Sequence, residues 1–148
     1  MKNIGTSKQE HMFGVAKYMA EHAEEYGLVP EEMYVLGLLH DIGYISDNAN
    51  HADAGSRLLF KLGYKDAKYI SWHETSPEEY KKAQLVEEIP KKLLLLYEAD
   101  LSVGLDGEEI GFDARLDSIK LRYSEDSETY RIALDTVDYL RSLKEGKE

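Results

Sequence analysis

The stretch "LGLLHDIGYI", residues 36–45, places an imidazole and a carboxylate side by side in an otherwise apolar run. The apolar residues within 35–39 would point in nearly all directions around a helix, so we expect this helix to be central and buried. His40 and Asp41 follow apolar residues at helical spacing and would lie over the same faces. A buried carboxylate is costly unless it is paired, hydrogen-bonded or bound to a metal. The stretch therefore indicates either a core His–Asp pair near a helix end or a metal site.

The rest of the chain also shows helical patterns. Ser7 and Glu10 match a capping box and Gly27 a C′ glycine, and Pro30 suits the first position of a helix. No segment alternates with period two for long enough to predict a strand. We expect an all-α, single-domain bundle of about seven to eight helices. They would lie near residues 7–26, 30–41, 52–62 and 65–73, from 76–79 onward, and near 90–103, 113–123 and 127–143.

Length and composition narrow the functional classes. A chain of 148 residues favours one domain. With 29 acidic against 18 basic residues, its net charge of −11 disfavours non-specific binding to nucleic acid or anionic lipid. The absence of cysteine excludes disulfides, thiolate catalysis and cysteine-based zinc sites. The N-terminus lacks the apolar region of a signal peptide, and the apolar run 93–97 is too short to span a bilayer. We expect a cytoplasmic protein without a membrane partner.

Two further polar residues lie on apolar helical stripes. His11 shares a stripe with Val15 and Met19, where a hydrogen-bonded core histidine is the alternative to a ligand. Asp100 lies in "KKLLLLYEADLSVGL" on the inward face, whereas Glu98 would face solvent or a basic partner. An inward aspartate needs a cation, which is either a metal ion or an arginine in a buried salt bridge.

The remaining histidines lie at helix ends. His51 would open the third helix and His73 would end the fourth, and each alone is compatible with a capping role. His22 is eleven residues from His11 on one helix, about 16 Å away, so the two cannot share one metal centre. We interpret His22 as a surface or structural residue.

Taken together, these residues indicate a metal centre built from several helices, as helical bundles often form them. Imidazole and carboxylate without sulfur suit iron, manganese, zinc, cobalt or nickel. Six potential ligands exceed the need of one tetrahedral ion, and two divalent ions bridged by a carboxylate would use them all. EF-hand, zincin, phosphate-loop and nucleophile-elbow patterns are absent. The candidate ligands are His11, His40, Asp41, His51, His73 and Asp100.

The order His…His-Asp…His…His…Asp resembles the HD-domain superfamily of metal-dependent phosphohydrolases. The motifs "EHMFGVA", "LLHDIGY", "HADAGSRLL", "SWHETS" and "LLYEADLSVG" carry the resemblance. The chain looks most similar to small bacterial HD hydrolases, including those that split symmetrical dinucleoside polyphosphates. The resemblance implies one HD domain over 1–148, with a metal-binding core at about 7–105 and C-terminal packing helices at about 112–143.

The resemblance also implies roles for the ligands. His11, His40, Asp41 and Asp100 would hold a first metal, and His51 and His73 would complete a second. Asp41 would bridge the two ions and position the metal-bound water, which makes it the expected catalytic residue. The substrate would be a nucleotide or another small phosphoester, cleaved by an activated water.

Departures from the family pattern leave the substrate open. Many members carry Lys three residues after the Asp, where this chain has Tyr44, and the residues after His73 differ from an "HTTG"-like sequence. Arg57 and Lys61 are candidate phosphate contacts, and Glu74 could orient a water. Each of these three is equally compatible with a solvated surface charge.

Two other functions use the same features. A di-iron oxygenase would use the same ligands, and a catalytically degenerate domain would bind a nucleotide or metal for signalling. The apolar residues of the C-terminal helices would pack on the core or on a second subunit, which would give a homodimer. They are Tyr123, Tyr130, Ile132, Leu134, Val137 and Leu140.

Overall fold

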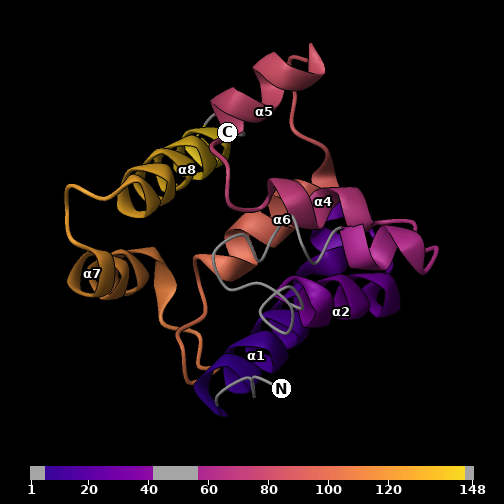
Figure 1. Cartoon of the computed structure of the whole chain (residues 1–148), viewed down its shortest axis with the longest axis horizontal. Coiled ribbons are helices and arrows are strands. Elements are labelled where there is room, and N and C mark those ends of the chain that lie inside the picture. The colour runs from indigo at the N-terminus through magenta and orange to yellow at the C-terminus, as the bar shows by residue number, and fades with distance from the viewer. Residues whose placement is uncertain (1–5, 42–56, 146–148) are drawn as a thin grey trace.

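A computed structural model describes residues 6–41 and 57–145 of the chain, and the elements of this part are helices joined by turns (Figure 1). Residues 57–61 are also helical, and the described residues contain no strand beyond an isolated bridge. The expected all-α fold is therefore confirmed. The elements are α1 (Thr6–His22), the 3₁₀ turn η1 (Ala23–Tyr26), α2 (Pro30–Leu39), α4 (Ala67–Trp72), α5 (Pro77–Gln84), α6 (Lys91–Asp100), α7 (Gly111–Tyr123) and α8 (Glu128–Glu145).

Several helix boundaries follow from the predicted capping residues. Pro30 is the first residue of α2, after an extended Val29. The Ser76 hydroxyl accepts a hydrogen bond from the Glu79 amide at the start of α5. Gly27 adopts φ 71° and ends the first helical segment after η1. These ends are local, so short sequence patterns suffice to predict them.

The expectation that the sixth helix continues to about residue 103 is wrong, because α6 ends at Asp100. The chain turns immediately afterwards: the Gly104 amide donates to the Glu108 carbonyl at 2.8 Å, and Val103 forms a bridge with Glu109. The short helix leaves Asp100 at a helix end, beside the other candidate ligands.

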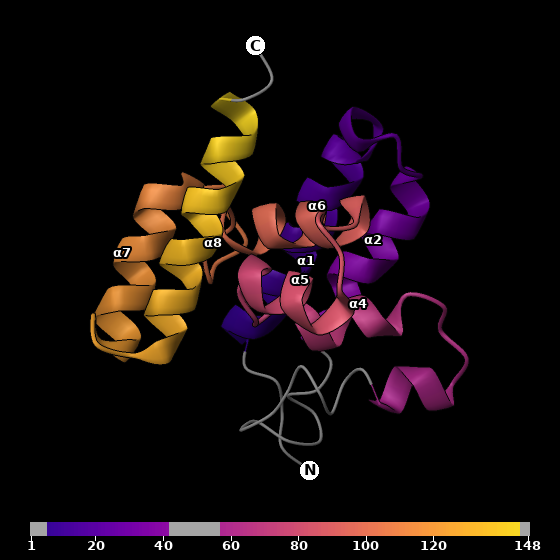
Figure 2. The same ribbon diagram turned by 90° about the horizontal axis from the view of Figure 1, so that it is seen from above.

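Helices α1, α2 and α6 form the centre of the fold, and the two views agree on their packing (Figures 1 and 2). A Cβ added at Gly37 would lie 2.7 Å from the Ala16 Cα, so the backbones of α1 and α2 touch there. The expected burial of α2 on all sides is wrong, because Val35 is 41% exposed. The buried side of α2 is the single stripe of Met33, Leu36, Gly37 and the following His40.

A second close approach holds the turn after α6 against α1. A Cβ added at Gly14 would lie 2.7 Å from both the Gly107 Cα and the Val103 Cγ1. Gly107 itself has φ 83°, a backbone conformation that favours glycine. The turn therefore lies directly on α1, one helical turn after His11.

Helices α7 and α8 form an antiparallel pair, and α8 packs on α6 (Figure 2). Glu98 is buried rather than solvent-facing, and its basic partner is Lys144 of α8 at 3.3 Å. Its carboxylate also accepts hydrogen bonds from the Tyr18 and Tyr26 hydroxyls at 2.6 and 2.7 Å. Burial raises the pKa of Glu98, but these hydroxyls and Lys144 outweigh it and hold the pKa below its usual range. The cluster thus ties α8 to the central helices.

The apolar residues of α8 divide between the core and the surface. Val137 and Leu140 are buried in the core, as expected for packing helices, whereas Leu134 is 38% exposed. Among the described helices, none is long and apolar enough to cross a membrane.

The contact between Gly37 and Ala16 predicts a specific weakness of the fold. Gly37→Val should lower the free energy of unfolding by about 1–3 kcal/mol, because the added atoms force α1 and α2 apart. Urea unfolding measures the loss. Val35→Ala on the exposed side of α2 is the control and should change stability by no more than about 0.5 kcal/mol. Equal urea midpoints for Gly37→Val and the wild type would contradict the close packing.

Candidate metal centre

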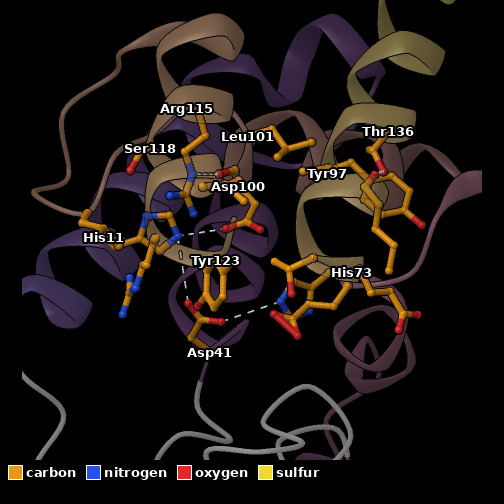
Figure 3. A pocket seen from close by; sticks show the side chains of 18 residues that line it. His11, Asp41, His73, Tyr97, Asp100, Leu101, Arg115, Ser118, Tyr123 and Thr136 are labelled. Atoms are coloured by element: carbon orange, nitrogen blue, oxygen red, sulfur yellow. Dashed lines mark hydrogen bonds and ion pairs between the residues drawn. The ribbon is translucent and has the colours of Figure 1, made fainter. Parts of the chain in front are cut away.

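Five of the six candidate ligands lie in the described part of the chain, and His51 lies outside it. Each of the five comes from the end or the inner face of a helix: His11 from α1, His40 and Asp41 from the end of α2, His73 from the end of α4, and Asp100 from the last residue of α6. Figure 3 shows His11, Asp41, His73 and Asp100 turned toward one another. Residues up to 89 positions apart in sequence therefore meet in one cluster.

The donor atoms of these side chains lie close together. The His11 Nε2 is 2.8 Å from the Asp100 Oδ1, and the His40 Nε2 is 3.3 Å from that same oxygen. The His40 Nε2 also lies 3.2 Å from the Asp41 Oδ2, and the His73 Nε2 lies 3.7 Å from the Asp41 Oδ1. Two overlapping groups result, His11–His40–Asp100 and His40–Asp41–His73, each with ligand atoms within 4.8 Å of one another.

The other ring nitrogen of each histidine is held by the backbone. The His40 Nδ1 donates to the Gly37 carbonyl and the His73 Nδ1 to the Ile70 carbonyl, each at 2.6 Å. Both histidines directly follow a helix, where carbonyls of the last turn lack their helical partners. The His11 Nδ1 donates to the Gly104 carbonyl at 3.1 Å, in the turn held against α1. A carbonyl only accepts, so each Nδ1 carries a proton and each Nε2 faces the carboxylates.

This arrangement fits a bound divalent cation. With Nδ1 bonded to a carbonyl, each Nε2 faces carboxylate oxygens, and this contact is favourable when positive charge lies between them, either as a second ring proton or as a metal ion. The His40 Nε2 is fully buried and makes no hydrogen bond within the described structure. A buried polar atom without a partner is costly, and a metal ion would satisfy it together with both carboxylates.

The electrostatics of the cluster also favour positive charge. Burial lowers the pKa of His40, but Asp41 and Asp100 outweigh burial and raise that pKa well above its usual range. Burial raises the pKa of Asp100, but His11 and His40 hold it well below its usual range. The carboxylates therefore stay ionised and attract a cation.

A pocket of about 400 Å³ opens onto the cluster. His11, Asp41, His73 and Asp100 form one side of it, and residues of α7 and α8 form the opposite side (Figure 3). This volume falls within the range of small-molecule sites, about 300–1,000 Å³. The arrangement suits a small substrate held between a metal centre and the C-terminal helices.

The candidate substrate contacts differ in their positions. Glu74 lines the pocket, one residue after His73. Arg57 and Lys61 are exposed in the helical residues 57–61, and neither is among the described residues that line the pocket. Tyr44 lies outside the described residues. The roles of Arg57, Lys61 and Glu74 stay predictions.

The sequence pattern did not indicate the far wall of the pocket. The C-terminal helices were expected only to pack, yet Arg115 and Arg122 of α7 line the pocket. Arg115, Ser118, Ile119 and Arg122 have the spacing of one helix face, and this spacing is only a weak indication that they share a pocket wall. Without the fold, such a stripe cannot be told from a solvated surface.

Comparison with known protein families supports the interpretation of this cluster as a metal site. Residues 9–103 match the HD domain family, and this match covers most of the chain. The chain belongs to the HD domain family, whose members are typically metal-dependent hydrolases of phosphorylated compounds. Helices α7 and α8 lie beyond the matched residues. Searches of curated proteins and of solved structures gave no significant match.

The cluster predicts that a divalent metal stabilises the protein. Zn²⁺ or Mn²⁺ at about 100 times its Kd should add about 2.7 kcal/mol to the free energy of unfolding, because the ion binds only the folded site. His40→Gln and Asp100→Asn should each weaken metal binding by at least about 100-fold. Calorimetric titration and thermal unfolding with and without metal measure the two effects.

His22→Gln is the matched control for these substitutions. His22, the last residue of α1, pairs with Glu25 of η1 and belongs to neither ligand group, so the variant should bind metal like the wild type. Undiminished metal binding in both His40→Gln and Asp100→Asn would place the metal elsewhere.

Proposed function

We propose that this protein is a metal-dependent phosphohydrolase that acts on a small phosphorylated substrate, with a nucleotide as the leading candidate. One observation carries the proposal: three histidine Nε2 atoms and two carboxylates converge in one cluster, and His11, Asp41, His73 and Asp100 of this cluster line a pocket of small-molecule size. The HD domain match supports the same chemistry. Histidine and carboxylate ligands without cysteine suit iron, manganese, cobalt, nickel or zinc.

The ligand roles that we propose are those that the resemblance to the HD-domain superfamily implies. His11, His40, Asp41 and Asp100 would hold one ion, and His73 and His51 would hold a second that shares Asp41. When bound, such ions lower the pKa of a water molecule and neutralise charge on the phosphoryl oxygens. The candidate ions are iron, manganese, cobalt, nickel and zinc, and metal analysis of the purified protein identifies the native one.

The residues of the chain hold the ligands in position. The three Nδ1–H bonds to backbone carbonyls fix each imidazole, so the ligands need no rearrangement during the reaction. In hydrolysis, the water oxygen bonds to phosphorus, the bond from phosphorus to the leaving oxygen breaks, and a proton passes to that oxygen. Asp41 faces the pocket and would orient the attacking water, and Glu74 on the same wall would hold its proton.

The volume of the pocket limits how much of a dinucleoside polyphosphate could bind inside it. A volume of about 400 Å³ suits one nucleotide-sized group, near the lower end of small-molecule pockets. We propose that a dinucleoside polyphosphate would place one half in this pocket and leave the other half outside.

Purified protein supplied with Mn²⁺, Fe²⁺, Co²⁺ or Ni²⁺ should release phosphate or a nucleotide from a panel of nucleotides and phosphoesters. Asp41→Asn should lower kcat by at least about 100-fold, because it removes the charge that would bridge the ions. A phosphate-release assay and chromatography of the products measure this effect, with His22→Gln as the control. Oxygen consumption without phosphate release would favour the oxygenase instead, and metal binding without turnover would favour the signalling domain.

A further inference from the structure

Helix α7 presents one polar stripe to the pocket. Arg115, Ser118, Ile119 and Arg122 all line it, at the spacing i, i+3, i+4, i+7 that defines one face of a helix. Arg115 and Ser118 are seen on this wall in Figure 3. The stripe lies outside residues 9–103, which match the HD domain family.

The two arginines of the stripe have no carboxylate partner in the part of the chain that the structure describes. Among the described residues, none offers a carboxylate within 4.0 Å of Arg115 or Arg122, although the chain has 29 acidic residues. The arginines of the same helix pair that lie away from the pocket are paired: Arg131 with Asp135 at 3.1 Å and Arg141 with Asp113 at 2.8 Å. Glu128, an acid on the pocket wall, lies 3.9 Å from Arg131. Within residues 6–41 and 57–145, no carboxylate is paired with the two guanidinium groups that line the pocket.

Arg115 is also fixed relative to the metal cluster. Its Nε donates a hydrogen bond to the Asp100 backbone carbonyl at 3.0 Å (Figure 3). This bond uses one of the five N–H donors of the guanidinium and leaves the others for a ligand. A phosphoryl group at the metal cluster would thus lie beside Arg115.

Arg122 lies seven residues further along the same face, about 10 Å along the helix axis. Its guanidinium lies over the Tyr123 ring, 5.6 Å from the ring centroid. Guanidinium groups match phosphate oxygens in a bidentate way and favour a substrate whose anionic groups extend from one arginine toward the other.

We propose that the α7 stripe is an anion-binding subsite that recognises a second phosphoryl group, so that the preferred substrate contains at least two linked phosphoryl groups. This inference rests on the proposed phosphohydrolase function and specifies its substrate class. One phosphoryl group binds at the metal cluster beside Arg115, and the next extends along α7 toward Arg122. Both arginines act as specificity-determining residues.

A binding experiment tests the subsite without turnover. The metal-loaded protein is titrated by calorimetry with methylenediphosphonate, which has two linked phosphoryl groups and no hydrolysable bridge, and with methylphosphonate, which has one. Arg122→Met should weaken methylenediphosphonate binding by about 10- to 100-fold, the usual effect of losing a charged hydrogen bond. It should change methylphosphonate binding by less than about 3-fold, since that probe does not reach Arg122.

Arg131→Met is the matched control, because it removes a guanidinium from the same helix pair at a position that does not line the pocket. It should bind both probes like the wild type. Equal binding of methylenediphosphonate by Arg122→Met and Arg131→Met would overturn the subsite. An equal loss for both probes in Arg122→Met would also overturn it, because the contribution of Arg122 would then not depend on a second phosphoryl group.

Kinetics separate this inference from the proposed function. With a nucleoside diphosphate, Arg122→Met should raise KM by about 10-fold or more and retain kcat, whereas KM for a nucleoside monophosphate stays near the wild-type value. If wild-type protein hydrolyses neither nucleotide but Arg122→Met still loses diphosphonate binding selectively, the subsite holds and the hydrolase proposal fails. If both nucleotides are hydrolysed alike by the wild type and Arg122→Met, the hydrolase holds and the subsite fails.

Discussion

The site depends on the hydrogen bond between the His40 Nδ1 and the Gly37 carbonyl. This bond fixes the proton on Nδ1 and turns the Nε2 of a fully buried ring toward the carboxylates of Asp41 and Asp100. His11 and His73 also each donate a hydrogen bond from Nδ1 to a backbone carbonyl. Imidazole nitrogens aimed at buried carboxylates require positive charge between them, and this set of ligands fits a divalent metal ion in that place.

Close backbone packing brings the ligand-bearing elements together. Contact between Gly37 and Ala16 sets α2 against α1, and contact between Gly14 and Gly107 holds the turn after α6 on α1. Arg115 then links α7 to the end of α6 through the Asp100 carbonyl. The metal cluster and the opposite pocket wall are thus connected through one residue, which explains how helices outside the family core come to face the candidate metal centre.

Much of this arrangement was predictable from the sequence because it rests on local signals. Pro30, Ser76 and Gly27 define helix ends by backbone chemistry, and the His-Asp pair is unusual within an apolar helix. The ligands His11, His73 and Asp100 were recognised through their order in the chain, and the structure brings these three together with His40 and Asp41. The placement of His51 lies outside the described residues.

Other features depend on tertiary contacts that a sequence pattern does not contain. The early end of α6 comes from the turn that packs on α1, and the exposure of Val35 from the particular face that α2 gives to its neighbours. Glu98 was expected at the surface or beside a basic residue, but two tyrosines and Lys144 enclose it. Arg115 and Arg122 were not recognised, because a polar helical stripe is interpreted as a pocket wall only once its neighbours are known.

Anomalous diffraction from crystals soaked with Zn²⁺ tests the central claim most directly. The account predicts a metal peak at the cluster, about 2.0–2.2 Å from the His40 Nε2 and from an oxygen of Asp41 or Asp100. Each Nδ1 should keep its backbone carbonyl. A protein that binds Zn²⁺ stoichiometrically at another position, with the His40 Nε2 still facing only carboxylates, would contradict the account.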